Sequence, residues 1–208
     1  MTLTAVVPVA FFTSEHVSMT DAFLTHLTDE VDSTIVFHNG GPLELEGWRM
    51  LAAHAPDVHF RPAAGWPFYR MWNEGIREVA EWWDPPLDED VVLVLNNDIE
   101  WDPGALRSLG DFLASAEPDV AIASPCPAGE PRWCFAIRPK HAPVIDERYH
   151  TWYGDTELEL LIDRAGLRRL HCDPGIRHPH IQTTTDHLPD VQALRLIDEA
   201  LFTEKWVT

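Results

Sequence analysis

The feature that most constrains the fold of this chain is an uninterrupted apolar run, Val-Val-Leu-Val-Leu, at residues 91–95. A membrane span needs roughly 20 apolar residues, so this run has the length of a strand. A strand without polar alternation is buried on both faces, as in the middle of a parallel sheet covered by helices. The run ends abruptly in Asn96, Asn97 and Asp98. It therefore predicts a central strand with polar groups at its carboxyl end.

Short apolar runs and amphipathic segments alternate along the rest of the chain, which predicts alternating strands and helices. We expect strands at residues 3–12, 34–37, 58–60, 90–95, 120–123, 133–137 and 167–171. We expect helices at residues 18–27, 45–54, 67–83, 102–113 and 155–165, and from about residue 190. Ser18, Asp102 and Asp155 are the predicted N-caps.

This alternation favours an α/β fold: a Rossmann-like, three-layer α/β/α sandwich with a mostly parallel central sheet. A length of 208 residues fits one domain covering residues 1–208. In such sheets ligands bind beyond the carboxyl ends of the strands. The segments 38–41 and 96–98 are therefore the first places to look for a site.

The charge balance limits the partners of this chain. Fifteen basic residues stand against 34 acidic ones, giving a net charge of −19. Nucleic acids and anionic membranes are bound through clusters of Lys and Arg, so neither is an expected partner, and no membrane span is predicted. A nucleotide substrate would need a local positive centre, which a divalent cation could supply.

The start of the chain and its cysteines bear on the compartment. The N-terminal segment lacks the basic region and cleavage site of a signal peptide. The three cysteines, Cys126, Cys134 and Cys172, show no CxxC spacing. We therefore expect a cytoplasmic protein with unpaired thiols that have no catalytic role.

The end of the central strand carries the first specific signal. Asn and Asp are common turn residues, so Asn96-Asn97-Asp98 is also typical of a turn leading into the next helix. A buried strand that delivers oxygen ligands to the rim of a sheet also suits Mg²⁺ or Mn²⁺. The segment resembles the DxD-type metal motif of family 2 glycosyltransferases with the GT-A fold, in its NxD form. Asp98 matches the metal-contacting carboxylate.

Three further segments extend this resemblance over roughly residues 3–185. Residues 73–76, Asn-Glu-Gly-Ile, are similar to the N-x-G-I segment that lies near the donor nucleotide. Residues 152–158 resemble the acidic acceptor-side motif, in which Asp155 matches the general base. Residues 178–184 resemble a late His-containing segment that contacts the metal or the diphosphate. The order and spacing of the four segments agree with the family.

The resemblance implies an inverting glycosyltransferase that uses Mn²⁺ or Mg²⁺ to move a sugar from a nucleoside-diphosphate sugar to an acceptor hydroxyl. The acceptor could be a glycan, a protein or a small molecule. Asp155 would be the catalytic base. The other implied site residues are the donor contacts His38, Asn39, Asn73, Gly75, Asn97 and Asp98, the acceptor-side residues Trp152 and Glu157, and the metal ligands Asp98 with His178 or His180.

The sequence departs from the family pattern at three positions. His38 stands where the family has an Asp that contacts the nucleobase. Gly154 replaces the Glu before the base, and Leu161 replaces an Arg later in the same helix. Arg70 and Arg138 are candidates to bind the donor phosphates instead, although either could be a surface charge.

Other interpretations stay open at this point. A nucleotidyltransferase also binds a nucleotide on a Rossmann-like sheet, and a catalytically inactive nucleotide- or glycan-binding module would keep the same fold. Asp155 could serve only as an N-cap. Trp66 and Trp152 could stack on a sugar. A structural zinc site could be built from the histidines at 171, 178, 180 and 187.

Overall fold

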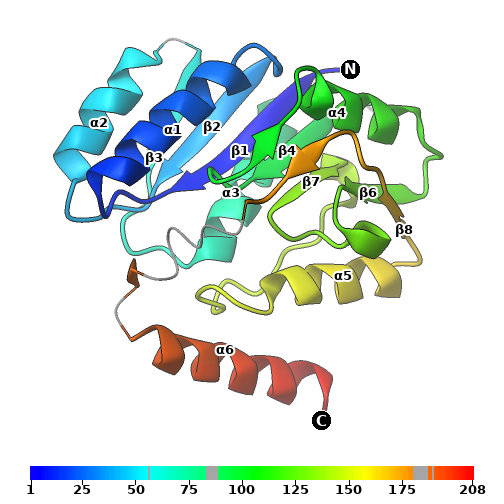
Figure 1. Cartoon of the computed structure of the whole chain (residues 1–208). Coiled ribbons are helices and arrows are strands. Elements are labelled where there is room, and N and C mark those ends of the chain that lie inside the picture. Colours follow the sequence, from blue (N-terminus) through cyan, green and yellow to red (C-terminus); the bar gives the residue numbers. More distant parts are fainter. Residues whose placement is uncertain (56, 83–88, 180–186, 189) are drawn as a thin grey trace.

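The structure, a computed structural model, describes residues 1–55, 57–82, 89–179, 187–188 and 190–208 (Figure 1). Its centre is a seven-stranded sheet of order β3-β2-β1-β4-β7-β6-β8. The strands are β1 (Leu3–Val9), β2 (Ser33–His38), β3 (Val58–Pro62), β4 (Val91–Leu95), β6 (Val120–Ser124), β7 (Cys134–Ile137) and β8 (Arg168–His171). All neighbours are parallel except β7, which is antiparallel to β4 and β6. The mostly parallel sheet is thus confirmed.

Helices cover both faces of this sheet (Figure 1). One face carries α1 (Ser14–Leu27), α2 (Glu44–Ala53) and α4 (Ala105–Ser115), and the other carries α3 (Phe68–Trp82) and α5 (Gly154–Arg164). Successive residues of a strand point to opposite faces, so Val7 of β1 packs with the first group and Val6 with the second. The predicted three-layer α/β/α sandwich is confirmed.

The last helix, α6 (Val191–Trp206), lies outside the three layers, below α5 in Figure 1. Its only buried residue is Asp198. Leu201 and Phe202 pack against the core that contains α3 and α5. None of the helices in the described part of the chain is long and apolar enough to cross a membrane.

None of the three predicted N-caps is the N-cap of its helix, and Asp155 lies in the first turn of α5. Helix α1 begins at Ser14, and the Thr13 side chain accepts a hydrogen bond from the His16 amide at 3.3 Å, so Ser18 lies inside the helix. Helix α4 begins at Ala105, and the carboxylate of Glu30 accepts the Leu106 amide at 3.0 Å and also the amide of Gly104. A distant carboxylate therefore caps α4, which the local sequence does not reveal.

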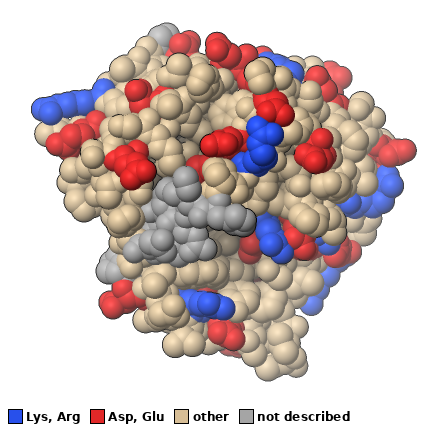
Figure 2. Space-filling model, viewed as in Figure 1, with Lys and Arg blue, Asp and Glu red and all other residues tan. Residues whose placement is uncertain are grey.

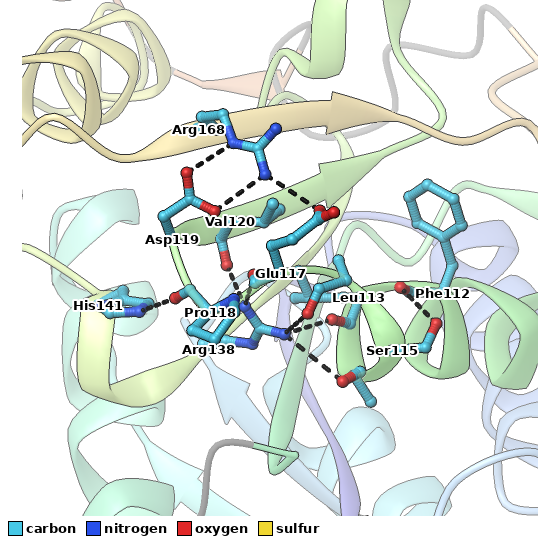
Figure 3. A network of polar contacts seen from close by, with 12 residues as sticks. Phe112, Leu113, Ser115, Glu117, Pro118, Asp119, Val120, Arg138, His141 and Arg168 are labelled. Atoms are coloured by element: carbon cyan, nitrogen blue, oxygen red, sulfur yellow. Dashed lines mark hydrogen bonds and ion pairs between the residues drawn. The ribbon is translucent and has the colours of Figure 1, made fainter.

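The carbonyl groups at the C-terminal end of α4 also accept hydrogen bonds from a side chain farther along the chain. Arg138 follows β7, is 2% exposed, and directs its guanidinium at the carbonyl oxygens that end α4 (Figure 3). It donates to Leu113 O and Ala116 O at 2.8 Å, and to Glu117 O at 2.6 Å. Leu113 lies in the last turn of α4, and Ala116 and Glu117 follow it directly, so Arg138 supplies donors where a helix end leaves carbonyls short of them. Arg138 is thus a structural residue and not a ligand for donor phosphates.

A small second sheet was not predicted. It pairs β5 (Glu100–Trp101) with β9 (Ile176–Arg177), antiparallel. Asp102, the predicted cap of α4, instead pairs with Arg177 at 2.6 Å. This sheet joins the segment after β4 to the segment before residue 178. It thereby decides which late residues meet the end of the central strand.

Candidate functional site

A cavity of about 820 Å³ opens at the carboxyl edge of the central sheet. Its walls come from the ends of β1 and β4, the segment 65–72, the β6–β7 turn, the segment leading into α5, and the first turns of α6. This is where an open α/β sheet is expected to bind ligands. The volume is within the range of pockets for nucleotide-sized molecules.

The three polar residues at the end of β4 have different roles. Asn96 donates its backbone N–H to the Trp133 carbonyl at 2.9 Å, and its side-chain Oδ1 is buried without a hydrogen bond to any residue that the structure describes. Asn97 donates its side-chain Nδ2 to Thr20 Oγ1 of α1 at 2.7 Å. Asp98 lines the cavity with a side chain that is 9% exposed. Asn97 is therefore the one of the three whose side-chain amide contacts α1.

Asp98 and His178 meet at the wall of the cavity. Their Oδ1 and Nε2 atoms lie 3.2 Å apart, and the His178 ring stacks on Trp133 with centroids separated by 5.4 Å. The β5–β9 pairing places them together. His180, the other predicted ligand, lies outside the described residues. Within the described part of the chain no three His, Cys, Asp or Glu side chains form a cluster that could hold a metal.

The groups that do meet there suit a hard divalent cation. Asp98 and His178 supply a carboxylate and an imidazole, and Asn96, which lines the same cavity, has a buried amide oxygen; Mn²⁺ accepts all three ligand types, and Mg²⁺ prefers the two oxygens. The residues present are therefore compatible with a metal ion.

Asp155 lies in the first turn of α5, and the N-cap is Tyr153, with a φ of 66°. The interpretation of Asp155 as a plain N-cap is thus wrong. Gly154 is required between them, because a Cβ there would lie 2.5 Å from the ring of Tyr69. Burial raises the pKa of the Asp155 carboxyl above its usual range, opposed by the Thr156 amide and the charge of Arg132.

The segment before α5 is held by the C-terminal helix. The buried carboxylate of Asp198 accepts backbone hydrogen bonds from His150, Thr151 and Trp152 at 2.9, 2.9 and 3.0 Å. Trp152 and Asp155 line the cavity just beyond this contact. Sequence reasoning missed Asp198 because it is 46 to 48 residues from its partners.

Two other predicted residues, Asn39 and Trp66, also line the cavity. Asn39 lines the cavity and donates its Nδ2 to the Trp66 carbonyl at 3.2 Å. Trp66 also lines it, and the Arg70 guanidinium lies 4.1 Å from the centroid of the Trp66 ring. Trp66 and Trp152 therefore both present aromatic surface to the same cavity.

His38 is not among the residues that line the cavity. It is 1% exposed and packs between Phe11 and Trp48, with ring centroids 5.0 and 4.8 Å away. Burial lowers the pKa of its imidazole, since a charged ring would be poorly solvated there. The structure thus places His38 at the end of β2, packed in the core and not at the cavity wall.

Asn73 and Gly75 also lie away from the cavity wall. The Asn73 side chain forms two hydrogen bonds with the backbone of Ile145: its Nδ2 donates to the Ile145 carbonyl at 2.8 Å, and its Oδ1 accepts the Ile145 N–H at 3.1 Å. At Gly75 a Cβ would lie 2.4 Å from Val6 Cγ1, so α3 can approach β1 only with glycine there. Both residues have architectural roles that the pattern alone did not reveal.

Glu157 was expected on the acceptor side, as a solvated or supporting carboxylate. Its side chain is fully buried and does not line the cavity. It pairs with Lys205 of α6 and accepts the Asp146 backbone N–H at 3.1 Å. Glu157 therefore attaches α6 to the domain.

The histidines considered for zinc do not gather in the described part of the chain. His171 contacts the Cys126 carbonyl through Nδ1 at 2.9 Å, and His187 stacks on Phe12 with centroids 5.7 Å apart. His178 is the one beside Asp98. The three cysteines are free thiols, and Cys126 and Cys134 are buried.

No known family model matches this sequence, and no curated protein matches it either. Solved structures do. Glucosyl-3-phosphoglycerate synthase from Mycobacterium tuberculosis, in complex with Mg²⁺ and uridine diphosphate, superposes with a TM-score of 0.62 at 14% identity, covering 97% of this chain and 78% of that one. The same enzyme has also been solved with Mn²⁺, uridine diphosphate and phosphoglyceric acid.

Nucleotidyltransferases share the fold as well. A 4-diphosphocytidyl-2C-methyl-D-erythritol synthase superposes with a TM-score of 0.56 at 15% identity, covering 94% of this chain and 98% of that one. A cytidylyltransferase from Leptospira borgpetersenii gives 0.56 at 7% identity, covering 99% and 95%. At such identities the likeness establishes the fold, which is GT-A-like and Rossmann-like.

Proposed function

We propose that this protein is an inverting, metal-dependent glycosyltransferase that moves a sugar from a nucleoside-diphosphate sugar to an acceptor hydroxyl. The observation that carries the proposal is the content of one cavity. The Asp98–His178 pair and the carboxylate of Asp155, at the start of a helix, both line it. Sugar transfer between two substrates needs a site for the leaving diphosphate and a base for the acceptor hydroxyl in one cavity.

At the donor end, Asp98 and His178, with the Asn96 amide oxygen, would hold Mn²⁺ or Mg²⁺. A bound ion would supply the positive charge that stabilises a leaving diphosphate. Such a charge matters in a chain with a net charge of −19. The similarly folded mycobacterial enzyme, whose structures contain uridine diphosphate with Mg²⁺ or Mn²⁺, supports this assignment.

At the acceptor end, Asp155 would accept the proton of the attacking hydroxyl. Its raised pKa makes it a stronger base than an exposed aspartate. Attack from the side opposite the diphosphate inverts the anomeric centre. Trp152, on the same wall, offers an aromatic face to the acceptor or the sugar.

A nucleotidyltransferase is the second candidate, favoured by the fold of the cytidylyltransferases. Such enzymes must hold a triphosphate, for which a glycine-rich, basic loop after the first strand is typical. Here β1 is followed by Ala-Phe-Phe-Thr, without glycine, lysine or arginine. Release of nucleoside diphosphate, rather than pyrophosphate, would decide for the glycosyltransferase. An inactive binding module would release neither.

The metal assignment is tested by thermal shift with UDP-, GDP- and dTDP-sugars, with and without Mn²⁺. The matching donor should raise the Tm of the wild type only with the metal, by mass action. Asp98→Ala and His178→Gln should each abolish this metal-dependent shift, because each removes a ligand.

Asp111→Ala, which removes an exposed carboxylate of α4, is the matched control and should keep the full shift. A metal-dependent shift of normal size in both Asp98→Ala and His178→Gln would show that the ion binds elsewhere.

A further inference from the structure

We propose that the acceptor carries an anionic group, a carboxylate or a phosphate, and that Arg195 of α6 binds it. The inference rests on the proposed function, since an acceptor exists only for a transferase. It concerns a residue to which neither the sequence motifs nor the metal-site geometry assigned a role.

The cavity differs in charge from the rest of the protein. Acidic residues outnumber basic ones by 34 to 15 in the chain, but among the residues that the structure describes the cavity is lined by two of each: Asp98, Asp155, Arg132 and Arg195. Asp98 belongs to the metal site and Asp155 to the base. The two arginines remain to be explained.

Arg195 differs from most arginines of this chain in its partners. Arg132 pairs with Glu130 at 2.8 Å, and Arg168 pairs with Asp119 at 2.7 Å. Arg195 is exposed and forms no ion pair with any residue in the described ranges. In so acidic a protein, a guanidinium that lines a cavity and pairs with no carboxylate among the described residues can bind a ligand.

The contacts of α6 fix the direction of Arg195. Residues 195, 198, 202 and 205 are spaced by three or four, so they share one face of the helix. Along this face Asp198 binds the backbone of residues 150–152, Phe202 stacks on Tyr153 with centroids 5.0 Å apart, and Lys205 pairs with Glu157. Arg195 is one turn further toward the start of the helix, over the cavity.

This placement puts Arg195 on the acceptor side. Asp198, one turn away, holds the backbone of Trp152, which is three residues before the base Asp155. A guanidinium binds carboxylate or phosphate oxygens in a bidentate manner. It would offset the repulsion that Asp155 exerts on an anionic acceptor, while the fixed helix limits the entropy lost on binding.

The test compares three probes that share a glycerol skeleton: glycerol, glycerate and glycerol 3-phosphate. Binding is measured by calorimetry, so no turnover is needed. Glycerate or glycerol 3-phosphate should bind the wild type more tightly than glycerol does. Arg195→Gln should weaken that binding about tenfold to a hundredfold, because it removes charge-assisted hydrogen bonds. The tighter of the two anions identifies the preferred group.

Arg49→Gln is the matched control, since it removes an exposed arginine from α2, on the opposite face of the sheet. It should leave all affinities unchanged. Equal affinity for glycerol and both anions, or full anion binding by Arg195→Gln, would overturn the proposal. Failure of the proposed function is a separate result, in which no donor sugar releases nucleoside diphosphate while the binding data stand.

Discussion

At the scale of single residues, Asp155 is defined by its surroundings more than by its motif. Burial is the largest cause of its raised pKa, and the Thr156 amide and Arg132 act in the opposite direction. Tyr69, packed against Gly154, determines that the residue before Asp155 has no side chain. Asp155 is thus placed at the cavity wall by packing.

The pH dependence of transfer follows from this environment. A base must be deprotonated, so the rate should fall as the pH drops through the raised pKa of Asp155. Asp155→Asn should bind donor normally and transfer about 10²- to 10⁴-fold more slowly. Arg132→Gln should move the acidic limb to higher pH, because the positive charge that favours the carboxylate is lost. Rates of transfer between pH 4 and 8 measure all three.

Asp111→Asn is the control for Asp155→Asn, because it makes the same substitution on the exposed surface of α4. Transfer by Asp155→Asn at the wild-type rate would exclude Asp155 as the base.

At the scale of elements, the ends and positions of helices depend on charged side chains from far along the chain. Glu30 caps the start of α4, and Arg138 satisfies its last carbonyls (Figure 3). Helix α6 buries only one residue, Asp198, which binds three backbone N–H groups. A buried carboxylate of this kind is costly to disturb because its partners would be left unsatisfied.

Asp198→Asn should therefore loosen α6 and the segment 150–152 while the sheet stays folded. An amide oxygen cannot replace both carboxylate oxygens, and we expect a loss of about 3 kcal/mol from this contact. Hydrogen exchange should show lost protection at residues 150–152 and in α6, with β1 and β4 unchanged. Glu199→Gln, an exposed neighbour, should exchange like the wild type. Unchanged protection in Asp198→Asn would show that apolar packing alone holds α6.

At the scale of the whole molecule, the net charge of −19 is the dominant electrostatic property. Figure 2 shows acidic side chains spread over the visible face, several of them beside basic ones. Exposed ion pairs contribute little, so the excess negative charge should dominate the response to salt. The fold accommodates much of this charge at the surface, while a few basic groups such as Arg138 and Lys205 have buried partners.

Raising the NaCl concentration from low to physiological levels should therefore raise the Tm. Screening shortens the range of the repulsion between acidic side chains to about 8 Å. A gain of about 1 kcal/mol in the free energy of unfolding corresponds to a rise in Tm of roughly 2–4 °C for a protein of this size. Scanning calorimetry measures the shift, with sucrose at equal osmolality as the uncharged control. A Tm that falls with added NaCl would mean that attractive pairs outweigh the net repulsion.

Local sequence patterns were enough to predict the three α/β/α layers and the position of Asp98 at the cavity. The apolar run at 91–95 and the alternation of strands and helices indicated the mostly parallel sheet, and the end of β4 located Asp98 at its carboxyl edge. These features repeat every two or 3.6 residues, so they can be read from neighbouring positions alone.

Tertiary structure decided which distant residues meet. The β5–β9 pairing joins residues 75 and 77 positions apart and brings His178 to Asp98, yet strands of two residues have no readable period. Chain packing also placed His38 in the core, Glu157 under α6 and Arg195 over the cavity. Such contacts depend on the path of the whole chain, because the free energy that selects them comes from burial and pairing between segments that the sequence does not place side by side.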